Sequence, residues 1–260
     1  AHAQGGVAVV VTKSESKAAF ITLKPLFDFY KSMYFGARTD FDRTVNLGQG
    51  ANQWPFAFSA VPAQTPTLIK MVDLGGKRPT AVKAALSGEQ RAWIATEDGT
   101  IQIYNLGNYA GNGQSASPAD IALRGSMAVG KNPTSLAYVK HDGEGDLIVV
   151  SRGESKLQWV QSSGNSGSIR RTLQDSRLKD PVWAEDNDNH GTESFVVTIA
   201  DYAGKRVSNY RYGAVTFESN PGTSCHAAPG CGTIGGAEFE YGGSHDVPGK
   251  VFQGRGANVA

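Results

Sequence analysis

One order of short runs recurs along this chain and constrains its fold more than any other feature. Residues 76–79 and 130–133 both read Gly-Lys-x-Pro, and their prolines lie about 54 residues apart. Each is followed by an apolar run, a second apolar run and, after a tight turn, a third. The second runs are residues 92–96 and 147–151, and the third runs are residues 101–104 and 157–160. A period of about 50 residues is typical of repeat folds.

The turns within these blocks indicate hairpins. Asp98-Gly99 stands between two alternating apolar runs, and both residue types tolerate the positive φ of a tight hairpin. Residues 9–17 match residues 148–156 in character, and residues 195–210 repeat the pattern again. If the strand before each Gly-x-x-Pro turn is counted with its block, each block holds four strands. We therefore expect an all-β fold, with a β-sandwich as the alternative.

Composition excludes several other classes of protein. Hydrophobic residues make up 40% of the chain and charged residues 19%, which is too apolar for a disordered protein. A net charge of +1 gives no sign of a nucleic-acid partner. No apolar stretch approaches the ~20 residues that span a bilayer. The 32 glycines suit many tight turns.

These blocks resemble the repeats of the YVTN-repeat and lactonase-like β-propellers. The resemblance implies one β-propeller domain over residues 1–260, with about four or five four-stranded blades of a ring of six to eight. The sequence departs from the family in an insertion at 23–43, expected to hold one short helix, and in a degenerate block at 45–58. It departs again at 219–247, expected to be irregular. We expect flanking sequence or a partner chain to supply the missing blades; pairing of residues 9–21 with 251–259 in a small ring is the alternative.

Two loops are rich in ligand-type side chains and occupy equivalent positions in adjacent blocks, residues 141–146 and 185–193. We expect loops joining the second and third strands to gather with the blade-to-blade connections on one binding face. Arg255, near the start of an expected inner strand, is a candidate to point into the central funnel, with an ordinary turn as the alternative. The candidates for this binding face are His141, Asp142, Glu144, Glu185, Glu193 and Arg255.

Part of the second loop resembles a calcium-binding loop. Asp186, Asp188 and His190 fall at positions one, three and five, with Gly191 at six. The match is partial, because position twelve is Val197 instead of glutamate. The pattern predicts a hard divalent cation, Ca²⁺, at Asp186, Asp188 and His190. A polar surface loop without metal is the alternative.

The two cysteines, Cys225 and Cys231, are expected to form a local disulfide. Their spacing is not that of a Cys-x-x-Cys metal or haem motif. A disulfide favours an oxidising compartment. We therefore expect an extracellular, cell-surface or periplasmic protein.

The function expected from the sequence is a non-catalytic scaffold that binds a protein or a cell-surface polymer through its loop face. None of the five histidines lies in a nucleophile or zinc-protease motif. The alternative is a lactonase-like or metal-dependent hydrolase with its site in the central funnel. A propeller that docks a redox partner is a third class. The four tryptophans, Trp54, Trp93, Trp159 and Trp183, are expected to pack between sheets, with a sugar-stacking platform as the alternative.

Overall fold

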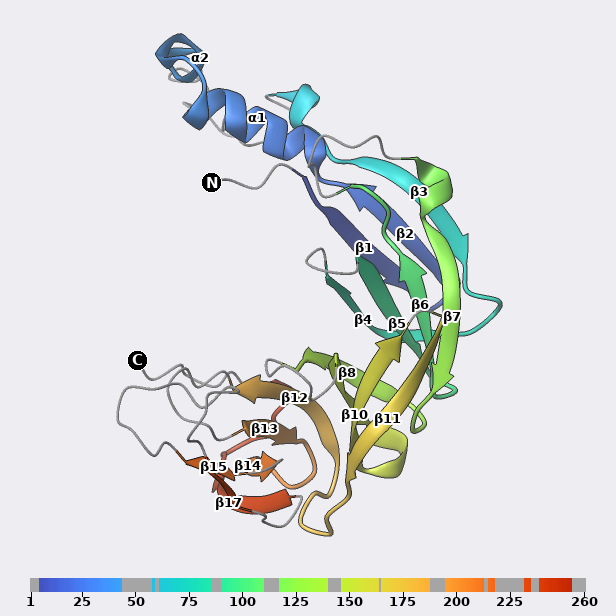
Figure 1. Cartoon of the computed structure of the whole chain (residues 1–260), viewed down its shortest axis with the longest axis vertical. Coiled ribbons are helices and arrows are strands. Elements are labelled where there is room, and N and C mark those ends of the chain that lie inside the picture. The colour runs from blue at the N-terminus through green and yellow to red at the C-terminus, as the bar shows by residue number, and fades with distance from the viewer. Residues whose placement is uncertain are drawn as a thin grey trace. The chain divides into compact units, whose positions relative to one another are not determined.

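A computed structural model describes residues 5–43, 58, 61–85, 90–109, 117–139, 146–163, 165–187, 195–212, 215–217, 232–234 and 239–253. Short strands dominate the described chain (Figure 1). The strands are β1 (Val7–Thr12), β2 (Lys17–Thr22), β3 (Thr67–Asp73), β4 (Pro79–Ala85), β5 (Arg91–Thr96), β6 (Thr100–Asn105), β7 (Ala122–Ala128), β8 (Pro133–Tyr138), β9 (Leu147–Ser151), β10 (Lys156–Ser163), β11 (Ser166–Leu173), β12 (Pro181–Asn187), β13 (Phe195–Asp201), β14 (Arg206–Tyr212), β15 (Val215–Phe217), β16 (Gly232–Ile234) and β17 (Phe239–Asp246). The helices are α1 (Lys24–Phe35) and α2 (Arg38–Asp42), with short 3₁₀ turns η1 (Pro62–Gln64), η2 (Pro118–Asp120) and η3 (Arg152–Glu154).

The strands form propeller-type blades. Three sheets have four strands, in the orders β4-β5-β6-β7, β11-β10-β9-β8 and β12-β13-β14-β17, and a further sheet has the order β1-β2-β3. In each of them neighbouring strands are in chain order, with β15 and β16 lying between β14 and β17 along the chain, and the described registers are antiparallel. Strands β15 and β16 form a separate two-stranded ribbon. The predicted all-β propeller fold is confirmed.

The Gly-x-x-Pro turns separate sheets, which corrects the order of strands expected within a block. Strands β4 and β8 begin at Pro79 and Pro133, as predicted, and β12 begins at Pro181. The strands before these turns, β3, β7 and β11, are the last strands of the preceding sheets. A strand can begin at proline because the missing N–H removes little from the ladder there. The turn therefore carries the chain out of one sheet and into the next.

This order shows which strands the first sheet contains. Strands β1 and β2 pair as β9 and β10 do, so β1, β2 and β3 correspond to the second, third and fourth strands of the larger sheets. Within the part of the chain that the structure describes, β1 pairs only with β2. Residues 254–260 lie outside that part. How the chain's first and last blades are completed therefore stays a prediction.

The turns between the second and third strands of the four sheets share one backbone feature. One residue with φ between 47° and 86° precedes the third strand at Ser16, Gly99, Ser155 and Lys205. A left-handed residue that closes a three- or four-residue loop matches the twist of a hairpin. Asp98-Gly99 therefore identified this turn in one sheet only, because Ser16, Ser155 and Lys205 take the place of Gly99 in the other three sheets.

The insertion at 23–43 holds two helices where one was expected. Pro25 lies in the first turn of α1, where proline is tolerated. Met33 is the buried residue of α1, and Lys24 pairs with Asp28 on its exposed side. Among the described residues, no helix is long and apolar enough to cross a membrane.

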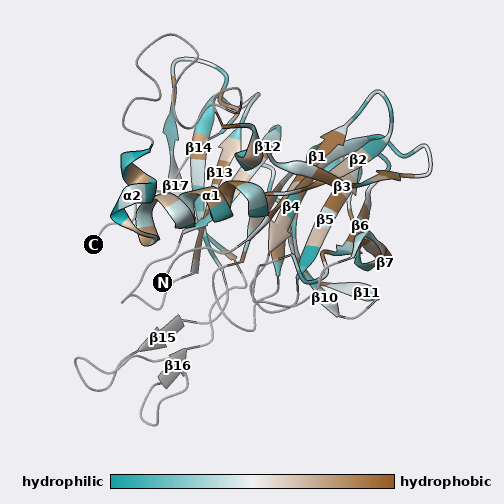
Figure 2. Ribbon diagram, turned by 90° about the horizontal axis from the view of Figure 1, so that it is seen from above, coloured by the Kyte–Doolittle hydropathy of each residue, from teal (hydrophilic) through white to brown (hydrophobic). Residues whose placement is uncertain are grey.

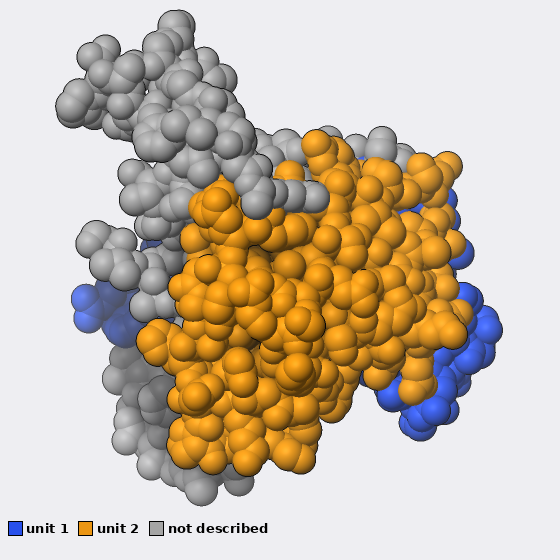
Figure 3. Space-filling view, turned by 90° about the horizontal axis from the view of Figure 1, so that it is seen from below, with its two compact units in different colours: residues 1–94, 103–124 blue, residues 95–102, 125–260 orange. Residues whose placement is uncertain are grey.

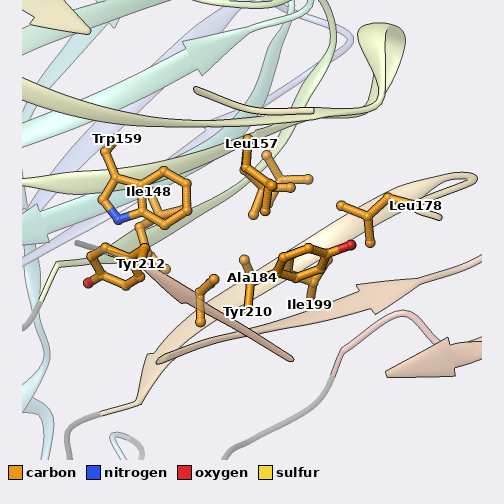
Figure 4. Close-up of a cluster of buried hydrophobic side chains, with 12 residues drawn as sticks. Ile148, Leu157, Trp159, Leu178, Ala184, Ile199, Tyr210 and Tyr212 are labelled. Carbon is orange, nitrogen blue, oxygen red and sulfur yellow. The ribbon is translucent and has the colours of Figure 1, made fainter. Parts of the chain in front are cut away.

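The chain divides into two compact units, residues 1–94 with 103–124 and residues 95–102 with 125–260 (Figure 3). The hydrophobic residues concentrate in strands (Figure 2). The core of the first unit joins β1 and β2 to β5 and β6, and Phe20 packs on Tyr104 with ring centroids 5.5 Å apart. The core of the second unit joins β8–β10 to β12–β14, with Trp159 against Tyr212 (Figure 4). Adjacent sheets thus pack face to face within each unit, as blades do.

Candidate binding face

The sheets of the second unit have two ends with different connections. At one end, residues 139–146 join β8 to β9, and residues 188–194 join β12 to β13. At the other end lie the β9–β10 and β13–β14 turns, together with the sheet-to-sheet connection of residues 174–180. Antiparallel strands alternate in direction, so successive connections fall at opposite ends.

The acidic loops therefore do not lie with the sheet-to-sheet connections, and the sequence-based placement was wrong on this point. The sequence analysis counted the strand before each Gly-x-x-Pro turn as the first strand of a blade. On that count, the short β10–β11 turn would be the connection between two blades. Both acidic loops connect the first strand of a sheet to its second strand, β8 to β9 and β12 to β13, and the loop residues themselves lie outside the described residues.

Most of the predicted site residues lie outside the described residues. This group comprises His141, Asp142, Glu144, Asp188, His190, Glu193 and Arg255, together with Cys225 and Cys231. Glu185 and Asp186 are described, and both lie in strand β12. The predicted binding role of the loops, the metal site and the disulfide stay predictions.

Asp186 is a buried strand residue in the structure, where the sequence placed it in a loop. Its exposed fraction is 0%, and the Tyr212 hydroxyl donates a 2.9 Å hydrogen bond to its carboxylate. The Arg171 guanidinium lies 5.4 Å from the centre of the Tyr212 ring. A buried carboxylate needs such partners because its desolvation is costly. In the described part of the chain, no group of three His, Cys, Asp or Glu side chains gathers as a metal site.

The calcium hypothesis makes a direct prediction about the 186–193 loop. A bound cation would hold this loop, so removing it with a chelator should lower the melting temperature by several degrees. Thermal unfolding followed by circular dichroism, with and without EDTA, measures the shift. Asp188→Ala should abolish the response, while Asp246→Ala, at an 86% exposed side chain elsewhere, should retain it. Superimposable wild-type curves would count against a bound metal.

The opposite end of these sheets carries a cluster of aromatic and basic side chains around Tyr202. Arg152 donates two 2.7 Å hydrogen bonds to Asp180, and its guanidinium lies 5.1 Å from the centre of the Tyr202 ring. The Lys250 ammonium lies 4.7 Å from the same centre. The Phe252 ring packs on Tyr202 at 4.8 Å while 67% of the residue stays exposed. We call these residues, with Lys179 and Lys205, the Tyr202 patch.

Backbone hydrogen bonds fix the patch on the ends of the strands. Tyr202 N–H donates to the Asp180 carbonyl at 2.9 Å, and Val247 N–H donates to the Lys205 carbonyl at 2.8 Å. These bonds tie the 174–180 connection, the β13–β14 turn and the segment after β17 into one surface. Hydrogen bonds therefore hold the backbone of the 174–180 connection and of the β13–β14 turn, whereas Lys250 and Phe252 lie in the irregular segment after β17.

The buried side chain of Asp201 holds two backbone segments of this surface together. It is fully buried at the end of β13 and accepts hydrogen bonds from the N–H groups of Lys179, Asp180 and Gly204, at 2.9, 2.8 and 3.0 Å. A buried carboxylate with three backbone donors is well satisfied. It locks the position of both segments that carry patch residues.

The patch keeps a positive charge. The hydrogen bonds to Asp180 raise the pKa of the Arg152 guanidinium, so Arg152 stays charged. Lys179, Lys205 and Lys250 are exposed. The sequence analysis missed this site because its members come from four separate segments. One signal was present: residues 249–250 repeat the Gly-Lys of the Gly-x-x-Pro turns, with Phe252 where proline stands elsewhere.

Comparison with known proteins adds little. No protein-family model matches the chain, and no curated protein matches it. Among solved structures, it is similar to the β-propeller domain of Cps50 (Swd1) from Myceliophteria thermophila, at 12% identity and a TM-score of 0.42. That match covers 79% of this chain and 50% of that structure. The fold assignment therefore rests on the sheets themselves.

Proposed function

We propose that this chain is a non-catalytic binding module that docks another protein through the Tyr202 patch. The observation that carries the proposal is Phe252, a large apolar side chain that is 67% exposed and packs on Tyr202, whose ring also lies near the Arg152 guanidinium and the Lys250 ammonium. Aromatic and arginine side chains are the groups that most often dominate protein–protein binding. An apolar centre with a polar rim is the usual arrangement of such interfaces.

The resemblance to YVTN-repeat propellers supports a scaffold role. The expected disulfide supports an oxidising, extracellular, cell-surface or periplasmic location. The proposed Cys225–Cys231 disulfide belongs to the same proposal. A hydrolase in the funnel is the competing function, and no arrangement among the described residues favours it over binding.

Replacing Phe252 by aspartate should abolish partner binding without unfolding the chain. The side chain is mostly exposed, so the fold should lose little stability, whereas a carboxylate would remove the apolar contact. Peptides would be selected from a random library displayed on phage, using the immobilised wild-type chain. We expect the enriched peptides to bind Phe252→Asp at least about tenfold more weakly, by fluorescence anisotropy.

Leu123→Asp is the matched control, because Leu123 is 55% exposed on strand β7. It should bind the selected peptides as the wild type does. Far-UV circular dichroism confirms that both variants are folded. A selection that yields no peptide, or only peptides that bind Phe252→Asp as tightly as the wild type, would exclude the patch as the binding site.

A further inference from the structure

We infer that the segment bound by the Tyr202 patch is an acidic peptide with an apolar residue among its carboxylates. This inference rests on the proposed function and adds the chemistry of the partner. The reason is that the Tyr202 patch carries an excess of positive charge, although the chain as a whole has a net charge of only +1.

The basic side chains of the patch remain largely available. Lys205 and Lys250 are exposed and form no ion pair within the described part of the chain, and the Lys179 ammonium donates to the Ser176 carbonyl. Arg152 uses one edge of its guanidinium on Asp180 and lies over Tyr202. Three ammonium groups and part of one guanidinium can therefore receive carboxylates from outside.

The acidic side chains of the same region are mostly engaged inside the protein. Asp201 accepts from three backbone N–H groups, and Asp180 accepts from Arg152 in a bidentate pair. Of Asp180, Asp201 and Asp246, only Asp246 has a strongly exposed side chain, at 86%. Its carboxylate lies 3.9 Å from the Arg206 guanidinium. The patch is therefore locally positive in a chain whose net charge is only +1.

The aromatic part of the patch favours a peptide over a nucleic acid. Single strands are held by several exposed rings on which successive bases stack. Here Phe252 is exposed and Tyr202 is half-buried beneath it and between cations, so the surface offers one apolar contact. A peptide with one apolar side chain, flanked by carboxylates, would place that side chain on Phe252 and its carboxylates near the basic side chains of the patch.

The composition of the selected peptide pool tests the inference. We expect peptides selected on the wild-type chain to be enriched in Asp and Glu relative to the unselected library. Lys205→Glu/Lys250→Glu should weaken their binding at least about tenfold, because it replaces attraction by repulsion. Lys31→Glu/Arg124→Glu is the control with the same change in net charge, at exposed positions on α1 and β7, and should leave binding unchanged. Raising the salt from about 50 to 500 mM should weaken wild-type binding several-fold.

Each other result has a definite meaning. A neutral or basic pool that still depends on Phe252 and ignores the lysine substitutions would overturn the acidic partner and leave the proposed function standing. A pool that ignores Phe252 would overturn both. Binding of oligo(dT) at least as tight as that of the selected peptides, and lost with Lys205→Glu/Lys250→Glu, would assign the patch to nucleic acid instead.

Discussion

Trp159→Ala is expected to lower the free energy of unfolding by about 4 kcal/mol, close to the upper end for a core aromatic. Trp159 has an exposed fraction of 0% on β10, and the centre of its ring lies 4.9 Å from that of Tyr212 (Figure 4). The centre of the Phe239 ring lies 5.3 Å away. These contacts join the β8–β11 sheet to the β12-β13-β14-β17 sheet, so the cavity would open between two blades. Urea denaturation followed by circular dichroism measures the change.

Two further variants separate packing from other effects. The buried Trp159 indole N–H has no hydrogen-bond partner among the described residues, so Trp159→Phe should cost only part of the packing, about 1–2 kcal/mol. Trp183→Ala, at a partly exposed position on β12, should cost clearly less than Trp159→Ala. Equal losses for Trp159→Ala and Trp183→Ala would show that Trp159 does not join the two sheets.

Asp201→Ala should destabilise the second unit by about 3 kcal/mol. The substitution leaves three backbone N–H groups, those of Lys179, Asp180 and Gly204, without their acceptor at a buried site. Asp201→Asn should cost less, because one carbonyl oxygen still accepts. Thermal and urea unfolding measure both. Asp246→Ala is the control, since this carboxylate is 86% exposed, and should change stability by no more than about 0.5 kcal/mol.

The Asp201 variants also test how the patch is held together. Because Asp201 positions the 174–180 connection against the β13–β14 turn, Asp201→Asn should weaken peptide binding while the chain remains folded. If Asp201→Ala were as stable as Asp246→Ala, the three hydrogen bonds would not hold these segments, and the patch would lack the support described above.

The sequence predicted features that depend on near neighbours along the chain. The β5–β6 and β9–β10 hairpins follow from alternating apolar runs and turn residues, and the starts of β4 and β8 follow from Pro79 and Pro133. Strand β17 was missed because Gly242-Gly243 interrupts its pattern, and because its partner, β14, lies beyond a long intervening segment. The sequence analysis grouped the strands into the wrong sheets. A sequence repeat shows the length of the repeating block, but it does not show at which strand a sheet begins or ends.

The Tyr202 patch shows the same limit. Arg152, Asp180, Tyr202 and Phe252 belong to four segments, and their proximity depends on pairing across two sheets. Sequence reasoning instead selected the loops with the densest acidic residues. The composition of those loops can be seen in the sequence, whereas the proximity of the Tyr202 patch residues depends on the fold.

Hydrogen–deuterium exchange of the wild-type chain, with and without a selected peptide, tests the central claim most directly. If the chain binds through the Tyr202 patch, the peptide should slow exchange in residues 176–180, 202–206 and 247–253, which carry it. Exchange in residues 140–145 and 188–194, at the opposite end of the same sheets, should not change. Slower exchange in those two loops, with none around Tyr202, would contradict the account and assign binding to the acidic end of the sheets.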